Sequence, residues 1–273
     1  MKTTVLVLPF DLFGSAGTSR GAELLGDALR ELMADNRRER KPTRARAYAK
    51  KVRLVEIALD TVEDLQNWRT KARAAVRGVL ESGEFLVWIT GNHLGTLPLI
   101  EEYGRENVEN LLVQLDAHFD IYNLSDCRKE LSHGNFLLHA EGSLPQLINI
   151  GNRELLLEPA YIRKYYSQSY SAAAFAARPE PVLKSIEVAC NAAPRVFLDI
   201  DCDVLDPAWF PAVTHPVPFG LSPTQLLQII EAASTDRLSG ICVSEFDPGR
   251  DNNDFCLAAL LWLLEFIFLK LYE

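Results

Sequence analysis

The sequence predicts an α/β fold in which a single doubly wound, mainly parallel sheet carries helices on both faces. Short apolar, β-branched segments alternate along the chain with amphipathic segments of helix length. The strand segments are apolar almost throughout, as expected for strands that are covered on both sides. No linker is long enough to divide the chain, so residues 1–273 are expected to form one three-layer domain.

The segments expected to form strands share short runs of valine, isoleucine, leucine and phenylalanine, which favour extended backbone. They cover residues 3–9, 52–59, 85–90, 111–116, 146–151, 195–201 and 238–245. In the segments expected to form helices, apolar residues recur at helical spacing. These cover residues 20–32, 61–83, 222–235 and 252–270.

Capping residues support two of these helices. Asp60 or Thr61 can cap the helix over 61–83, and Gly83 stands where that helix should stop. The helix over 222–235 opens with Ser222 as N-cap and a proline at the first helical position.

Composition excludes several classes of protein. Hydrophobic residues make up 48% of the chain and charged residues 24%, so global disorder is excluded. Five scattered cysteines without a CxxC pair argue against a disulfide scaffold and against a cysteine zinc site. The apolar run at the start is too short for a signal peptide, and a cytoplasmic location is expected.

The C-terminal segment, residues 255–272, is strongly apolar but contains Glu265 and Lys270. A membrane-spanning helix needs about 20 apolar residues with few charges. We therefore expect a helix buried in the domain and no membrane partner.

Residues 37–53 contain nine lysines and arginines and one glutamate, within a chain whose net charge is −9. A solvated helix end and loop is the favoured interpretation, and a docking site for an acidic partner is the alternative. Tyr48 is the only aromatic residue there and the whole chain is acidic, so a nucleic-acid partner is not expected.

Acidic residues and histidines follow several of the predicted strands. Asp116, His118 and Asp120 alternate along one extended segment, which turns all three side chains to the same side. Asp201 and Asp203 repeat the arrangement after a second strand, and His93 follows a third. In a parallel sheet these strand ends meet at one edge, where ligands bind.

Four carboxylates gathered at one place cannot all stay ionised without a cation. So many oxygen ligands favour two divalent ions rather than one. Mn²⁺ suits such a site best, and Fe, Co, Ni or Zn are alternatives.

Three motifs resemble the arginase/agmatinase (ureohydrolase) family: LDAHFD at 115–120, DCDVLDPAWFPA at 201–212 and SEFDP at 244–248. TGNHLG at 90–95 stands where that family has a GGDHS-type motif. The resemblance implies an arginase-like three-layer fold and hydrolysis of a guanidino group to an amine and urea by two Mn²⁺ ions. The six ligands that it implies are His93, Asp116, His118, Asp120, Asp201 and Asp203. It also assigns Glu245 to holding the cationic substrate and His133 to carrying the proton to the leaving amine, and it implies a homo-oligomer.

The chain departs from that family mainly where the substrate would be recognised. Tyr122 replaces the usual asparagine, Arg128 and Lys129 lie in a stretch that is normally small and polar, and His215 stands at a normally small position. These four residues are the candidate substrate-binding residues.

Two further departures lie beside the expected ligands. Asn92 replaces an aspartate next to His93, and Asp199 stands where the family prefers serine. Changes beside a ligand can alter metal preference.

The basic residues suit a carboxylate-bearing or acidic substrate, and the favoured one is an arginine side chain within an acidic precursor peptide, converted to ornithine. The alternative is a small-molecule ureohydrolase acting on agmatine, free arginine, a guanidino acid or formiminoglutamate. A deacetylase-like metallohydrolase and a non-catalytic binding protein are less favoured, because all six ligands are present.

Overall fold

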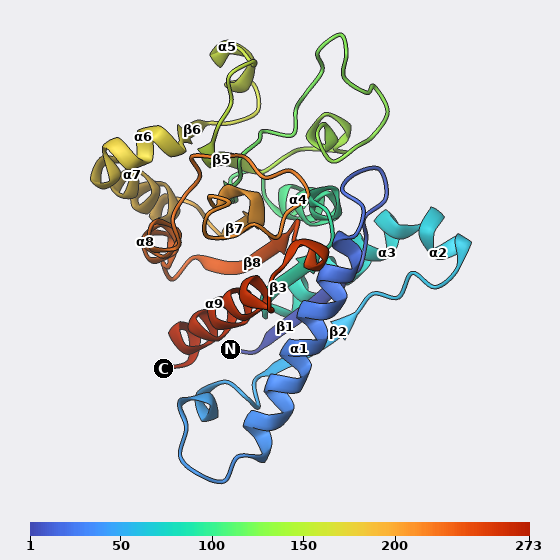
Figure 1. Cartoon of the computed structure of the whole chain (residues 1–273), viewed down its shortest axis with the longest axis vertical. Coiled ribbons are helices and arrows are strands. Elements are labelled where there is room, and N and C mark those ends of the chain that lie inside the picture. Colours follow the sequence, from blue (N-terminus) through green and yellow to red (C-terminus); the bar gives the residue numbers. More distant parts are fainter.

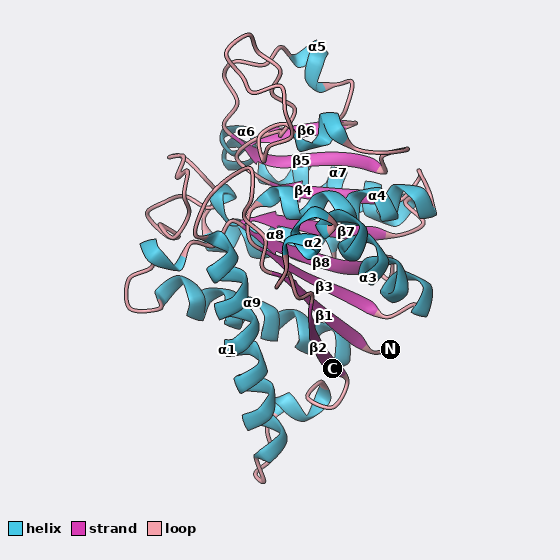
Figure 2. Cartoon of the chain, turned by 90° about the vertical axis from the view of Figure 1, so that its right-hand side faces the viewer, coloured by secondary structure: helices cyan, strands magenta, loops and turns pink.

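The computed structural model describes residues 1–273 and contains one sheet of eight strands, all parallel. Across the sheet the order is β2-β1-β3-β8-β7-β4-β5-β6, and Figure 2 shows the strands in magenta. Their bounds are β1 Thr3–Leu8, β2 Val52–Glu56, β3 Phe85–Thr90, β4 Leu111–Leu115, β5 Gln146–Asn152, β6 Gln168–Ser171, β7 Val196–Asp201 and β8 Leu238–Ser244. The predicted fold class is confirmed, and all seven predicted strands are present.

The helices lie on both faces of the sheet (Figure 1). They are α1 Thr18–Arg38, α2 Val62–Gln66, α3 Trp68–Ser82, α4 Leu97–Glu106, α5 Pro159–Ile162, α6 Ala172–Ala177, α7 Pro179–Ala192, α8 Pro223–Ala233 and α9 Phe255–Tyr272. One hydrophobic core of 47 buried residues joins α1, α6, α7, α8 and α9 to the sheet. A second core of 27 buried residues joins α3 and α4 to the opposite face. Successive strand residues alternate between the two cores, so each central strand is apolar on both sides.

The sequence prediction did not include the helices α4, α5, α6 and α7. It was wrong in two further places. The helix expected over 61–83 is two helices, α2 and α3, because Asn67 leaves helical geometry with φ −104° and ψ 14°. Thr61 does cap α2, in a capping box with Asp64. Strand β6 was missed because its sequence, QSYS, is polar and short, as an edge strand can be.

The apolar helix α9 covers one face of the sheet. It is the one helix long and apolar enough, by length and composition, to cross a membrane. Seven of its residues are buried in the larger core, and its contacts with α1 place it within the domain. On its outer side Trp262 is exposed and stacks on Phe266 at 5.3 Å between ring centroids.

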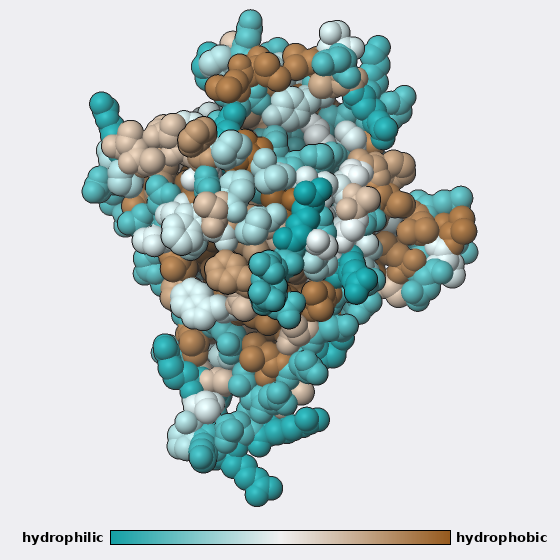
Figure 3. Space-filling model, in the orientation of Figure 1, coloured by the Kyte–Doolittle hydropathy of each residue, from teal (hydrophilic) through white to brown (hydrophobic).

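The basic segment 37–53 lies at the amino edge of the sheet. The amide of Thr3, the first residue of β1, donates to the carbonyl of Lys51 at 3.0 Å. Arg37 donates to the carbonyls of Ala49 and Val52, both at 2.8 Å. Hydrophilic side chains cover the lower end of the molecule in Figure 3, where Figure 1 shows the end of α1 and the loop that follows it. The segment is therefore at the edge opposite the strand ends that carry the acids and histidines.

Candidate metal centre and active site

Three of the four neighbouring strands at the middle of the sheet deliver the predicted ligands, and the fourth, β8, leads to Glu245. β3, β8, β7 and β4 are adjacent, and their carboxyl ends meet at one edge. His93 follows β3, the DAHFD segment (116–120) follows β4, and Asp201 ends β7. All six residues predicted as ligands come together there, and five of them are buried; His118 is partly exposed.

A first cluster of donor atoms surrounds the Nδ1 atom of His93. This nitrogen lies 2.8 Å from Oδ2 of Asp120 and 3.2 Å from Oδ2 of both Asp116 and Asp201. His93 Nδ1 and Asp120 Oδ2 are buried and make no hydrogen bond. Buried donor atoms that converge without a hydrogen bond between them are the arrangement that a cation would complete.

A second cluster lies next to the first and shares Asp116 with it. His118 Nδ1 is 2.9 Å from Oδ2 of Asp203 and 3.7 Å from Oδ1 of Asp116. Asp116 thus turns one carboxylate oxygen to each cluster. Two sets of ligand atoms are each compact enough to hold a metal ion: one from His93, Asp116 and Asp120, the other from Asp116, His118 and Asp203. The donors fit two divalent ions that share a carboxylate.

Backbone amides hold these carboxylates in place. The amide of His118 donates to Asp116 at 2.6 Å, and the amide of Ala117 donates to Asp203 at 3.1 Å. Asp201 accepts from the amide of Asp203 at 2.9 Å. Each bond links a carboxylate to a strand end or the turn after it, so the sheet fixes the donor positions.

The charges of the site are balanced only in part by the chain itself. Burial and the neighbouring Asp120 raise the pKa of Asp116 to about 6, and burial with Asp203 raises the pKa of Asp201 well above its ordinary value. Burial opposes the charged form of His118, but Asp203 raises the pKa of His118 to about 10. The site thus retains protons that a divalent cation would displace.

Glu245 and His133 lie beside the two clusters in a cavity of about 290 Å³ that also contains Ser15. One oxygen of Glu245 accepts from the amide of His93 at 2.8 Å, and the other makes no hydrogen bond within the chain. Glu245 has a left-handed backbone, φ 62°, which turns it out of β8 toward the cavity. His133 Nδ1 lies 3.7 Å from Oε1 of Glu245, and this carboxylate raises the pKa of His133.

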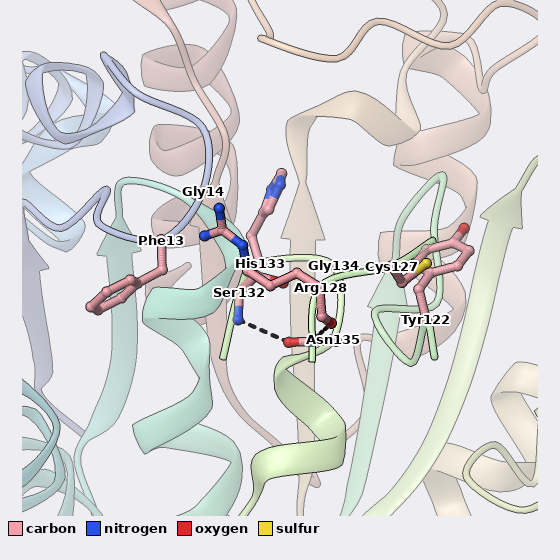
Figure 4. A pocket seen from close by; sticks show the side chains of 9 residues that line it. All are labelled: Phe13, Gly14, Tyr122, Cys127, Arg128, Ser132, His133, Gly134 and Asn135. Atoms are coloured by element: carbon pink, nitrogen blue, oxygen red, sulfur yellow. Dashed lines mark hydrogen bonds between the residues drawn. The ribbon is translucent and has the colours of Figure 1, made fainter. Parts of the chain in front are cut away.

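A wider chamber of about 540 Å³ adjoins this cavity and shares Tyr122, His133 and Gly134 with it. Arg128 lines the chamber and makes no ion pair; Figure 4 shows its guanidinium group extending toward Gly14 and His133. No acidic residue lines the chamber. The guanidinium group of Arg128 therefore gives its lining a positive charge.

The four candidate substrate residues fall at different places. Tyr122 lines both cavities and donates to Glu154 at 2.7 Å. His215 lines the inner cavity, with its ring centroid 5.5 Å from that of His133, and Arg128 lines only the outer chamber. Lys129 is exposed and lines neither, so the structure does not bring it to the site.

Sequence reasoning missed Ser15 as a site residue. Its hydroxyl lies 3.3 Å from Nδ1 of His133. The signal available was its position in the glycine-containing loop after β1, which opens at the same edge as the other strand ends.

Comparison with known proteins identifies the family of this chain. A sequence model of the Arginase family matches residues 1–267. The chain belongs to the arginase family. It is 25% identical to an agmatinase of Photorhabdus laumondii over 277 residues, covering 96% of this chain and 85% of that protein. As a member of this family, the chain is a hydrolase that acts on guanidino C–N bonds. The sequence motifs predicted this activity.

Solved structures with the arginase fold superpose closely. Agmatine ureohydrolase of Thermoplasma volcanium matches with a TM-score of 0.77 at 25% identity, covering 99% of this chain and 90% of that one. Arginase of Bacillus subtilis matches with a TM-score of 0.79 at 21% identity, covering 98% of both chains.

Proposed function

We propose that the chain is a binuclear-metal ureohydrolase that releases urea from a small guanidino compound. The observation that carries the proposal is the pair of donor clusters sharing Asp116, which line one cavity with Glu245 and His133. Mn²⁺ is the ion that we expect, because carboxylate oxygens dominate both clusters. The arginase-family match favours this function over a deacetylase-like enzyme and over a binding protein without turnover.

Two bound ions would supply the Lewis acidity that makes water a nucleophile near neutral pH. The chain would hold them with His93, Asp120 and Asp201 on one side, His118 and Asp203 on the other, and Asp116 between. The guanidinium carbon is a poor electrophile, so the substrate must also be held firmly over this site.

Glu245 would bind the guanidinium group. One of its oxygens is fixed by the amide of His93, and the other is unpaired. A carboxylate that faces a cationic, planar guanidinium can accept hydrogen bonds from it and fix its orientation. His133 is next to Glu245 and in the wall between the two cavities, where the leaving amine would depart.

His133→Ala is expected to retain both metal ions and to lose mainly turnover. The imidazole of His133 lies 3.3 Å from the hydroxyl of Ser15 and belongs to neither donor cluster. Loss of a positioned general acid costs typically 10²–10⁴-fold in rate, so kcat should fall by about that factor while metal content is unchanged. Metal analysis and steady-state kinetics check this, and unchanged kcat would remove His133 from the reaction.

The substrate is more consistent with a small molecule than with an arginine in a precursor peptide. Agmatinases and an arginase are among the relatives that match. The basic segment 37–53, one reason to expect an acidic peptide, lies at the opposite edge of the sheet from the cavity. It therefore offers no support for peptide binding near the active site.

Arg128 favours a small substrate with a carboxylate at its far end, such as a guanidino acid. It lines the outer chamber beside the metal cavity and has no acidic partner. A carboxylate there would pair with it, whereas the ammonium group of agmatine would be repelled. Agmatine is the second candidate, because several agmatinases are similar to this chain.

A substrate panel tests this choice. The Mn²⁺-loaded protein is given 4-guanidinobutyrate, agmatine, free L-arginine, formiminoglutamate and an acidic arginine-containing peptide, and urea or formamide is measured. We expect the highest kcat/KM with 4-guanidinobutyrate. Arg128→Ala should lower the ratio of kcat/KM for 4-guanidinobutyrate to kcat/KM for agmatine about tenfold. This is somewhat more than an exposed charge pair contributes, because the pair would form inside a cavity.

Lys129→Ala is the matched control, because Lys129 is the neighbouring cation but lines neither cavity. It should leave the ratio unchanged. An equal effect of both variants would show that Arg128 acts through the overall positive charge of this region and does not bind the substrate directly. Urea released from the peptide alone would instead support the peptide as the substrate. A cytoplasmic location and a homo-oligomer stay predictions, to be measured by cell fractionation and analytical ultracentrifugation.

A further inference from the structure

The two ring nitrogens of His93 have different surroundings. Nδ1 faces the carboxylates of the first cluster. Nε2 lies 2.9 Å from Oδ2 of Asp199, a side chain outside both clusters. A neutral imidazole carries one proton, and the partner of one nitrogen decides which nitrogen is free to bind a metal. A proton on Nε2, donated to Asp199, leaves the Nδ1 lone pair directed at the first cluster.

Asp199 has no other partner that could neutralise it. The side chain is fully buried on β7, between the strands that deliver His93 and Asp116. Its Oδ1 atom is buried without a hydrogen bond, and no lysine or arginine forms an ion pair with it. A buried carboxylate that is not paired with a positive charge is costly to keep. The cost is offset if His93 transmits the charge of a cation bound on its other side.

The chemistry of this residue differs from that of the serine at the same place in the resemblance described above. A hydroxyl accepts a hydrogen bond from an imidazole without adding charge, whereas a carboxylate makes a stronger, charge-assisted bond. Such a partner makes the imidazole a better electron donor to a metal. This chain would therefore bind the ion at His93 more tightly than the ligand set alone provides.

We propose that Asp199 is a positioning residue that fixes the Nε2–H form of His93 and thereby sets the affinity of the His93 cluster for its divalent ion. The His118 cluster has its own carboxylate, Asp203, and should not depend on Asp199. The inference rests on the proposed binuclear site, and it adds a residue that does not touch the metal or the substrate.

The test is calorimetric titration of the metal-free protein with Mn²⁺, with wild type beside Asp199→Asn and Asp199→Ser. Wild type should bind two ions per chain. Each variant should bind one ion with wild-type affinity and the other about 10–100-fold more weakly, the usual cost of losing a partner of a ligand histidine. The asparagine variant should lose less, because its amide oxygen still accepts from Nε2.

A second readout follows the proton itself. In the Zn²⁺-loaded protein with ¹⁵N-labelled histidine, the NMR spectrum should show His93 with its proton on Nε2. Asp199→Ser should weaken or shift that signal while the other histidines stay in place. A purely structural role for Asp199 would not change this signal selectively.

Asp206→Asn is the control for loss of charge near the site. Asp206 lies in the loop after β7 and accepts from the amides of Ala208 and Gly220 at 2.9 and 3.0 Å, without contacting His93. It should leave both affinities within about twofold, below the 0.5 kcal/mol typical of changes at uninvolved positions. Equal weakening of both ions in the Asp199 variants, or an effect of Asp206→Asn of the same size, would overturn the inference. Unchanged affinities and an unchanged His93 signal would overturn it as well. If wild type itself binds no Mn²⁺, the proposed function is wrong. This outcome is distinct from failure of the Asp199 inference, in which wild type binds two ions but the Asp199 variants do not behave as expected.

Discussion

Asp116→Asn is expected to abolish urea release and to reduce the tightly bound metal below two ions per chain. Asp116 is the one carboxylate that belongs to both donor clusters, with Oδ2 toward His93 and Oδ1 toward His118. An amide carries no charge and can offer only one oxygen, so one cluster loses this ligand and the other keeps it only as a neutral oxygen. Metal ions supply several kcal/mol to hydrolysis of this kind, and about 4 kcal/mol corresponds to a thousandfold loss of rate.

The same variant separates loss of metal from loss of fold. Burial and Asp120 raise the pKa of Asp116 to about 6, above its ordinary value of 3.8. The folded metal-free protein therefore binds that proton more tightly than the unfolded chain, and this group makes stability fall as pH rises from about 3.8 to about 6. Asparagine removes this cost, so the metal-free variant should melt no lower than metal-free wild type at pH 7.5.

Inductively coupled plasma analysis, urea release and thermal melting measure these three outcomes together. Asp27→Asn, an exposed substitution on α1, is the control and should match wild type in all of them. An Asp116→Asn protein that bound two ions and turned over normally would contradict the assignment of a shared carboxylate.

Glu245→Gln is expected to lower kcat/KM by about 10²–10³-fold and to leave both metal ions bound. Glutamine can still accept from the amide of His93, so the backbone of the cavity should be retained. It cannot pair its charge with a guanidinium group, and truncating one partner of a buried charge pair costs about 2–5 kcal/mol. The pKa of His133 should also move down, because Glu245 is the group that raises it.

Steady-state kinetics over a range of pH, with metal analysis of the same samples, measure the effect of Glu245→Gln. Glu231→Gln on α8 is the control, since Glu231 pairs with Lys270 and does not line the cavity. If the Glu245 variant lost its metal, Glu245 would act as a ligand rather than as a substrate residue. If kcat/KM were unchanged, the guanidinium group would bind elsewhere.

Much of the centre could be predicted from sequence because it depends on local geometry. The alternation of Asp116, His118 and Asp120 turns three side chains to one side of an extended segment whatever the rest of the chain does. Apolar strands imply a parallel sheet, and a parallel sheet brings strand ends to one edge. The expected ligands therefore converge once β3, β8, β7 and β4 lie side by side in the sheet.

Other features depend on which strands are neighbours, and this order is not encoded by local pattern. Asp199 meets His93 only because β8 alone separates β3 from β7 in the sheet. The basic segment ends at the amino edge because α1 returns the chain there before β2 starts. The break at Asn67 and the polar edge strand β6 were missed because each is a short exception within an otherwise ordinary pattern.

The central claim is that two metal ions at the shared clusters drive hydrolysis of a guanidino group. It is tested most directly by titrating the metal-free protein with Mn²⁺ and measuring urea from 4-guanidinobutyrate and agmatine after each addition. Urea release should rise with bound metal and reach its plateau at two ions per chain. Two ions bound with no urea from any guanidino compound, or full activity at one ion per chain, would contradict the account.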